Sequence, residues 1–329
     1  MLRHIFSLML CLLSCSVFAQ SSKQECYSYL RTYTPESLGI LKIIENIPSK
    51  HKIKGITITL SRGFKPENYF RGRTETDKIS SLNTVIHESH HEFNSAYAYV
   101  LLSHEPPKDY EFADEYSAFY YADDDIILVK HGEIFNSNEL KREIPKELQS
   151  FRYKPYIAPR SNLGSQVQGI YGLLDEFHSY YLGTKASMET FTYYQELAKT
   201  DIQAYLDFIS NTCSSSWAFY EFKYFSLKYL QKAKNDYPET YKELMANNEL
   251  RRIYTKTSTA FEQLVEEFHQ KEKQIMEQAK AAGVESYTDD EYFWIDNRGV
   301  GNRGDKTEAL KAELNKQEMV ALHRAFILN

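Results

Sequence analysis

The clearest alternation of apolar and polar side chains spans residues 54–61. Ile56, Ile58 and Leu60 would project from one face of an extended segment, and the threonines and serine between them would project from the other. This period of two residues predicts a half-buried β-strand. The next segment, residues 62–78, mixes charged residues with two glycines and shows no regular period, so we predict a loop there.

Two further β-rich runs, Tyr116–Ala122 and Ile126–Lys130, are separated by Asp123, Asp124 and Asp125. Aspartate is frequent in tight turns because its side chain bonds to nearby backbone, so the pattern predicts a β-hairpin. Three adjacent carboxylates could instead bind Ca²⁺, and this second interpretation stays open.

The remaining regular pattern is helical, with apolar residues recurring at intervals of three and four. One helix is predicted at residues 80–103, where Pro106 and Pro107 follow it, and another at residues 165–184. The charged segment 138–160 between them contains several prolines, and we predict an excursion over the surface. The other predicted helical ranges are 25–33, 35–47, the nearly continuous stretch 189–281, and 306–326 after a glycine-rich turn at 298–304.

The N-terminus predicts export. Arg3 precedes an apolar run at residues 5–13, and residues 17–19 are typical of a signal-peptide cleavage site, so we expect residues 1–19 to be removed. The apolar run is too short for a transmembrane span. A lipoprotein-box pattern also ends at Cys15, which leaves open a lipid anchor there instead of release into the periplasm or the medium.

The composition excludes some classes of binding partner and predicts the redox state of the cysteines. The net charge is −6 and no block of basic residues stands out, which argues against nucleic acid or an anionic membrane as a partner. Of the four cysteines, only Cys26 and Cys213 would remain after removal of the leader. In an oxidising compartment this pair predicts one disulfide, with two buried free thiols as the alternative.

The candidate chemistry is concentrated in Thr84–Phe93, which contains the pattern H-E-x-x-H from His87 to His91. On a helix the two histidines lie one turn apart, about 40° from each other on one face, so both imidazoles can bind one Zn²⁺. Glu88 lies about 100° from His87, too far round to be a ligand. It is near enough to accept a proton from a water at the metal.

A zinc site needs at least one further protein ligand, and Glu176 in the predicted helix 165–184 is the best candidate. Small residues on one face would let that helix approach the histidines closely. A glycine inside a helix costs roughly 0.5–1 kcal/mol, so three of them on one face indicate a packing reason. The residues within about 60° of Glu176 are Gly169, Gly172, Ser179 and Gly183.

Other candidates for the third ligand stay open at this point. They are His178, His104, His131, Asp114 and Glu115. His90, which lies between the two motif histidines, is expected to be a packed or hydrogen-bonded core residue rather than a ligand.

The motif resembles the H-E-x-x-H helix of the zincin metallopeptidases, and Leu174–Tyr180 is similar to the second ligand helix of their gluzincin branch. Two positions depart from the usual pattern. Glu92 is charged where the extended motif usually has an uncharged residue, and Tyr180 stands where many members have an acid that orients a ligand histidine. The segment between His91 and Glu176 is also longer than in the best-known gluzincins.

The resemblance implies an α+β fold with a zincin-like catalytic region at residues 20–185, in which a small sheet lies over the H-E-x-x-H helix. A mainly α-helical region at residues 186–329 would follow. It also implies tetrahedral zinc on His87, His91 and Glu176, with Glu88 as general base.

From these residues we expect an exported zinc metallopeptidase that hydrolyses a peptide or protein substrate, its oligomeric state unspecified. Tyr180 is the first candidate to donate to the developing oxyanion and Tyr171 the second. The edge of the strand predicted at 54–61 could bind an extended peptide. Two alternatives stay open: an exported binding or envelope-assembly protein with a structural or vestigial zinc site, and a zinc amidase that acts on cell-wall cross-links.

Overall fold

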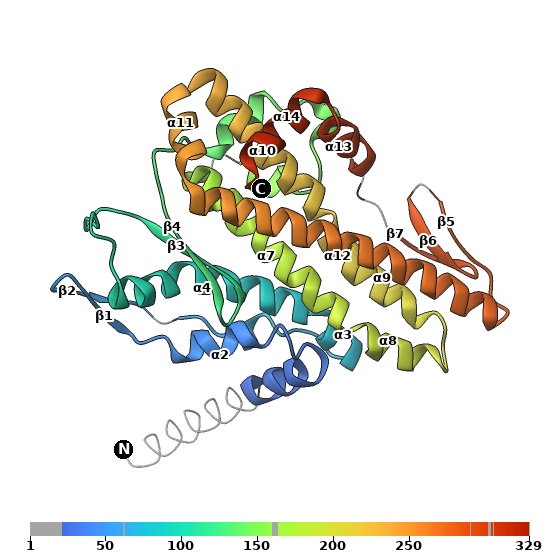
Figure 1. Cartoon of the computed structure of the whole chain (residues 1–329). Coiled ribbons are helices and arrows are strands. Elements are labelled where there is room, and N and C mark those ends of the chain that lie inside the picture. The colour runs from blue at the N-terminus through green and yellow to red at the C-terminus, as the bar shows by residue number, and fades with distance from the viewer. Residues whose placement is uncertain are drawn as a thin grey trace, which may run out of the picture.

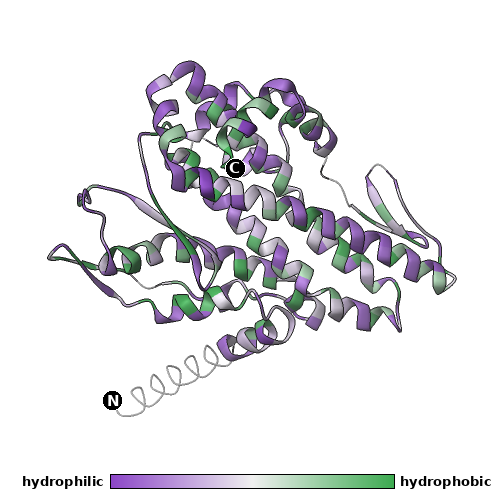
Figure 2. Cartoon of the chain, viewed as in Figure 1, coloured by the Kyte–Doolittle hydropathy of each residue, from purple (hydrophilic) through white to green (hydrophobic). Residues whose placement is uncertain are grey.

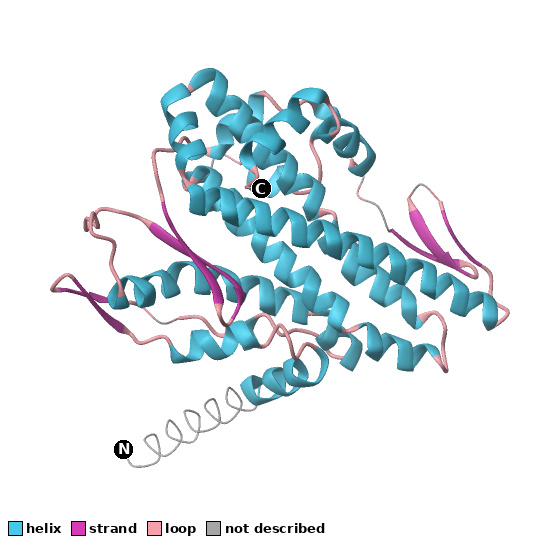
Figure 3. Ribbon diagram, viewed as in Figure 1, coloured by secondary structure: helices cyan, strands magenta, loops and turns pink. Residues whose placement is uncertain are grey.

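The computed structural model describes residues 22–61, 63–159, 164–289, 291–301, 304 and 306–328. The predicted signal peptide and the alternative lipid-anchor residue, Cys15, lie outside the described residues. Helices dominate and the strands form small antiparallel sheets (Figure 3), so the α+β class is confirmed. Among the described residues, no helix has both the length and the apolar character that crossing a membrane requires.

Two long helices, α4 (Leu82–His104) and α7 (Gly169–Glu189), pack against each other near the middle of the molecule (Figure 1). Both confirm helices that the apolar period predicts. A Cβ atom at Gly183 would lie 3.0 Å from the backbone oxygen of Asn83 and 3.4 Å from the Cβ atom of His87. Glycine therefore lets α7 approach the part of α4 that carries the motif.

The other glycines of α7 serve different contacts. A Cβ atom at Gly172 would lie 2.4 Å from the backbone oxygen of Ser165, and one at Gly169 would lie 2.6 Å from the hydroxyl of Tyr229. Gly169 also has a φ of 56°, which side chains rarely adopt. The predicted packing role of small residues against the histidine helix is thus correct for Gly183 and wrong for these two.

The opposite side of α7 packs against helices from the C-terminal part of the chain. They are α9 (Ala204–Ser216), α10 (Ala218–Asp236) and α12 (Asn248–Ala281). The ring of Phe177 lies 6.2 Å from that of Phe219 and 5.7 Å from that of Phe261, measured between centroids. Figure 2 shows the amphipathic character of α12, which is largely hydrophilic on the visible side. The expected boundary at residue 185 therefore falls inside a helix that packs against both predicted regions.

The strands of the described residues form three small antiparallel sheets. Their bounds are β1 (Lys50–Ile53) with β2 (Ile56–Thr59), β3 (Tyr116–Ala122) with β4 (Asp125–Lys130), and β5 (Ser286–Thr288) with β6 (Tyr292–Ile295) and β7 (Arg298–Gly301). The hairpin of β3 and β4 confirms the prediction from the β-rich runs. The sheet of β5, β6 and β7 was not predicted, and β7 begins in the predicted glycine-rich turn.

The strand predicted at residues 54–61 forms only in part, as β2, and the prediction that it is half-buried is wrong. Lys54 and Gly55 have positive φ angles of 45° and 89° and form the turn of a β1–β2 hairpin. The strand after the turn is mostly exposed, and Ile56 keeps 44% of its surface. A two-residue turn that ends in glycine is a known hairpin signal, and it explains why the alternation begins only after Gly55.

The turn between β3 and β4 confirms the structural interpretation of the aspartates. Asp123 Oδ1 accepts a hydrogen bond of 2.8 Å from the Tyr120 hydroxyl. Asp125 forms an ion pair with Lys256 of α12. Asp123 and Asp125 thus have separate protein partners, and among the described residues no three carboxylates converge at this turn, as Ca²⁺ ligands would.

The predicted disulfide is wrong. Cys26 and Cys213 are both free and buried. They belong to separate hydrophobic clusters, because the N-terminal helix places Cys26 against α2 (Gly39–Asn46) and α4, whereas Cys213 on α9 packs near β6 and β7. The thiol of Cys213 donates to the backbone oxygen of Gly301 at 2.9 Å.

The remaining helices complete the fold. They are residues 22–33, α3 (Glu75–Ser80), α5 (Tyr153–Tyr156), α6 (Gly164–Val167), α8 (Phe191–Ala198), α11 (Pro238–Ala246), α13 (Thr307–Leu314) and α14 (Gln317–Phe326), with 3₁₀ turns at Pro66–Asn68, Ser137–Arg142 and Lys146–Leu148. The loop predicted at 62–78 therefore misses the start of α3. Thr74 and Asp77 form a capping box there, which is a helix-start signal.

Candidate metal centre

The two motif histidines project from the same face of α4, as their spacing predicts. Their Nε2 atoms lie 3.1 Å apart, and their rings meet edge to face with centroids 4.8 Å apart. Burial, and then the neighbouring His91, lower the pKa of His87 well below its usual range. A neutral imidazole keeps a lone pair on the nitrogen, and this is the form that binds metals.

Glu176 on α7 brings a carboxylate oxygen to the same point. Its Oε2 lies 3.7 Å from His87 Nε2 and 3.6 Å from His91 Nε2. The three atoms form a nearly equilateral triangle. In a tetrahedral site with bonds of about 2.0–2.2 Å, ligand atoms lie about 3.3–3.6 Å apart, so the triangle has the right size. His87, His91 and Glu176 form a group that could hold a metal ion.

The state of Glu176 also fits a cation at this point. Its side chain is 10% exposed, and Oε2 is buried without a hydrogen-bond partner. A buried polar atom without a partner is costly, and a bound cation would remove that cost. Burial raises the pKa of Glu176 to about 7, with a further contribution from Asp175 and an opposing one from His91. The donor set therefore fits a metal ion.

Asp175 fixes the orientation of His91. Its Oδ2 accepts a hydrogen bond of 2.7 Å from His91 Nδ1, which turns the Nε2 lone pair of that ring toward the triangle. Burial opposes a charge on His91, but the Asp175 carboxylate outweighs it and raises the pKa to about 10. A metal ion bound at Nε2 would therefore have to displace the proton that this nitrogen carries at neutral pH. The other oxygen of Asp175 lies 3.1 Å from His90 Nδ1, which also contacts Ser179 Oγ at 3.0 Å. His90 is thus a buried hydrogen-bonded residue, as predicted.

Two tyrosines stand beside His87. The ring of Tyr180 meets the ring of His87 edge to face, with centroids 4.5 Å apart. The hydroxyls of Tyr180 and Tyr156 lie 3.0 Å apart. The guanidinium carbon of Arg152 lies 4.2 Å from the centroid of the Tyr180 ring, within the range of a cation–π interaction. These contacts hold Tyr180 next to the metal triangle.

Arg152 is in turn held by the C-terminal helices. Its Nη1 donates to Glu221 Oε2 at 2.6 Å, its backbone nitrogen donates to Glu221 Oε1 at 2.8 Å, and its Nη2 donates to the Ser214 backbone oxygen at 2.6 Å. Both charged side chains are about 95% buried or more. The segment predicted as a surface excursion, residues 138–160, therefore carries buried residues into the site, and that prediction is wrong.

Glu88 faces an open hollow beside the triangle. The hollow has a volume of about 160 Å³ and is lined by Asn83, Thr84, His87, Glu88, Tyr156, Tyr180, Gly183 and Ser215. Glu88 is half-buried. It does not belong to the metal-binding group, in agreement with its predicted position 100° from His87. His87, Glu88 and Tyr180 thus border one accessible space.

The rival ligands are engaged elsewhere. His178 Nε2 lies 2.6 Å from the Tyr120 backbone oxygen and its Nδ1 lies 2.9 Å from Thr257 Oγ1, so both nitrogens have partners. His131 Nε2 lies 2.9 Å from Ser117 Oγ. The others also lie outside the group: Asp114 pairs with Lys130, while His104 and Glu115 are exposed.

Tyr171, the second oxyanion candidate, lies away from the triangle. Its hydroxyl accepts a hydrogen bond of 2.9 Å from the Gly132 backbone nitrogen and one of 3.2 Å from Asn247, and its ring stacks on His131 with centroids 4.0 Å apart. Tyr180 alone of the two candidates borders the hollow.

No protein-family model, curated protein or solved structure matches this chain. Membership of a family is therefore not shown. What the site can do follows from its own residues: two imidazoles and a carboxylate aimed at one point, a second carboxylate beside them, and a hydroxyl pair on the other side of His87.

Proposed function

We propose that the protein is a zinc-dependent hydrolase that cleaves peptide bonds. The observation that carries the proposal is the triangle formed by His87 Nε2, His91 Nε2 and Glu176 Oε2, with edges of 3.1, 3.6 and 3.7 Å. Among common ions, Zn²⁺ binds imidazole and carboxylate together in four-coordinate sites of this size. A set of three protein ligands also supports catalysis, because structural zinc sites usually have four.

A zinc ion held by this set would polarise the substrate carbonyl and lower the pKa of a water toward neutrality. Glu88, which borders the hollow, would accept a proton from a water there as the water oxygen bonds to the carbonyl carbon. It then gives the proton to the nitrogen of the leaving amine as the C–N bond breaks. The position of Glu88, in the hollow but outside the metal-binding group, supports this role.

Tyr180 is proposed to stabilise the negative charge that develops on the carbonyl oxygen. A hydroxyl that is already oriented can donate a hydrogen bond to the oxyanion without reorganising. The Tyr156 hydroxyl at 3.0 Å and the Arg152 guanidinium over the ring provide that orientation. Tyr156, Arg152 and Glu221 thus join the proposed machinery as supporting residues.

The proposal includes export, inferred from the leader, to the periplasm or the medium, or to a lipid anchor at Cys15. It also favours an enzyme over a binding protein with a structural zinc. The half-buried Glu88 and the hollow of about 160 Å³ at the metal triangle have no purpose in a closed structural site. A zinc amidase that acts on cell-wall cross-links would use the same groups, so the assay below includes such a substrate.

The test is to purify the protein after expression with added zinc, measure the metal by elemental analysis, and incubate it with mixed synthetic peptides and with cross-linked cell-wall fragments. About one zinc per chain together with new peptide termini is the expected result. A protein without zinc, or a zinc protein that hydrolyses none of the peptides, overturns the proposal. Cleavage confined to the cell-wall fragments identifies an amidase instead.

A further inference from the structure

A second cavity begins one helical turn from Glu88. On α4, Glu92 and Ala96 follow Glu88 at intervals of four residues, so all three lie along one side of the helix, with about 5–6 Å between successive Cβ atoms. Glu92 and Ala96 line a cavity of about 230 Å³. The charged residue that departs from the extended motif thus lies in a cavity wall, next to the proposed catalytic carboxylate.

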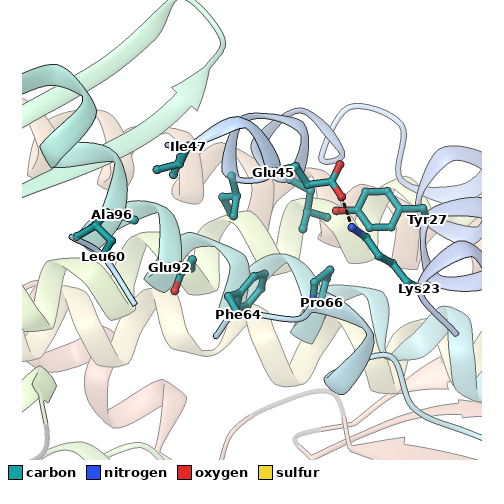
Figure 4. A pocket seen from close by; sticks show the side chains of 11 residues that line it. Lys23, Tyr27, Glu45, Ile47, Leu60, Phe64, Pro66, Glu92 and Ala96 are labelled. Carbon is teal, nitrogen blue, oxygen red and sulfur yellow. Dashed lines mark ion pairs between the residues drawn. The ribbon is translucent and has the colours of Figure 1, made fainter. Parts of the chain in front are cut away.

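Four segments build this cavity (Figure 4). Besides α4, they are the N-terminal helix 22–33, α2 with the residue that follows it, and the chain after β2. Seven of the 11 lining residues are apolar, namely Leu41, Ile44, Ile47, Leu60, Phe64, Pro66 and Ala96. Lys23 and Glu45 also line the cavity, and they form an ion pair of 2.6 Å with each other.

The cavity wall continues in an aromatic pair on the chain after β2. The ring of Phe64, in the cavity wall, stacks on the ring of Tyr69 with centroids 6.0 Å apart. Burial, and then the Glu88 carboxylate, raise the pKa of Tyr69. Because Glu92 in the cavity wall lies one helical turn from Glu88 on α4, a peptide with its scissile bond at Glu88 would have a neighbouring side chain within reach of the cavity.

We propose that this cavity is the specificity pocket of the hydrolase and takes a large apolar side chain, such as leucine, methionine or phenylalanine, from a residue next to the scissile bond. The inference rests on the proposed function. The cavity volume of about 230 Å³ leaves room for a side chain of this size.

The first experiment compares cleavage sites. A library of synthetic decapeptides is digested with the wild-type, zinc-loaded protein, and the products are sequenced by mass spectrometry. Large apolar residues should be enriched on one side of the cleaved bond. In Ala96→Leu, which fills the pocket, this preference should fall by roughly 10- to 200-fold, the usual effect of methylene-sized changes in an apolar pocket. In Leu60→Ala, which enlarges it, the preference should move toward larger side chains.

The matched control is Ile56→Ala. Ile56 lies in β2, the strand that directly precedes Leu60. It is 44% exposed and does not line the cavity. Its cleavage preference should equal that of the wild type. If Ala96→Leu does not fold, Leu60→Ala still tests the pocket, because Leu60 is only partly buried and does not belong to α4.

The second experiment measures binding without turnover. Zinc-loaded Glu88→Gln is titrated by calorimetry with a hexapeptide that contains leucine at the selected position and with its alanine analogue. The leucine peptide should bind more tightly by at least about tenfold, and adding Ala96→Leu should abolish the difference while Ile56→Ala should retain it. A preference for basic residues, or an apolar preference that neither pocket variant changes, overturns the pocket assignment while hydrolysis stands. Absence of zinc or of hydrolysis overturns the proposed function, and the pocket assignment with it.

Discussion

Asp175 and His91 form a hydrogen bond of 2.7 Å that decides which nitrogen of the imidazole faces the metal triangle. The proton on Nδ1 is held by the carboxylate, so the lone pair on Nε2 points toward Glu176 Oε2 at 3.6 Å. Asp175 and Glu176 are adjacent on α7. One turn of this helix would therefore supply both a ligand for a metal ion and the residue that orients a second one.

Asp175→Asn should weaken zinc binding by about 10- to 100-fold without removing a ligand, because the amide no longer holds the Nδ1 proton as firmly. Chelator competition with a fluorescent zinc indicator measures the affinity. Asp109→Asn is the matched control, since the side chain of Asp109 is 78% exposed and lies on another segment. Equal affinity in wild type and Asp175→Asn would exclude the orienting role.

Glu88→Gln should retain zinc and lose about 10²- to 10⁴-fold in turnover, because the amide cannot accept the proton. Glu176→Ala should lose zinc and activity together, because a ligand has gone. The two variants are compared by elemental analysis and by peptide hydrolysis, with Glu105→Gln just after α4 as the control. Full activity in Glu88→Gln would show that another group accepts the proton, and full zinc content in Glu176→Ala would place the third ligand elsewhere.

The part of the site that lies within one helix could be predicted from the sequence. The spacing of His87 and His91 on α4 follows from the helical period alone, and so does the position of Glu88 away from the metal-binding group. Glu176 required a second argument, namely that a glycine face marks a close helix contact. Gly183 confirms that argument, with a Cβ position only 3.0 Å from the backbone of α4.

The supporting residues could not be found in the same way, because their partners are distant in sequence. Arg152 has Glu221 as its partner, 69 residues away, and no local period connects them. Arg152 also stands in a charged, proline-containing segment whose composition predicts surface exposure, yet its charge is neutralised in the interior. Asp175 is adjacent to the predicted ligand Glu176. The only sign in the sequence that Asp175 belongs to the site is that it lies one turn before Ser179, on the same side of the helix.

Local turn chemistry explains the errors in the fold. The turn at Lys54 and Gly55 takes up the first two residues of the predicted strand, because glycine tolerates a φ of 89° and the chain reverses there. The disulfide prediction relied on composition alone, which contains no information about distance. Once Cys26 and Cys213 are packed into separate clusters, no bridge can form between them.

Arg152→Met should destabilise the protein by about 3–5 kcal/mol, because it leaves the buried Glu221 carboxylate without its partner. The double variant Arg152→Met with Glu221→Leu should recover much of this loss, since no isolated charge remains. Urea unfolding followed by circular dichroism gives the free energies. Glu196→Gln, which breaks an exposed pair with Lys199, is the control and should change stability by less than about 0.5 kcal/mol. Additive losses in the double variant would show that the two residues do not act as a pair.

The last prediction concerns acid stability and His131. Burial lowers the pKa of His131 to about 4, whereas an unfolded histidine titrates near 6.5. The unfolded chain therefore binds a proton at a pH where the folded protein does not. This group contributes its full stabilisation above about pH 6.5 and loses it progressively as the pH falls toward 4. At pH 5 the loss from this one residue should reach about 2 kcal/mol.

Replacing His131 by glutamine should remove that part of the pH dependence, while the stack on Tyr171 and the contact with Ser117 would be weakened at every pH. The informative quantity is thus the difference in unfolding free energy between pH 7.5 and pH 5.0, measured by urea titration. It should be smaller in His131→Gln than in the wild type by about 2 kcal/mol. His104→Gln, at the exposed end of α4, should leave the difference at its wild-type value. An unchanged difference in His131→Gln would mean that His131 is accessible to protons in the folded state, and that the stack on Tyr171 opens at acid pH.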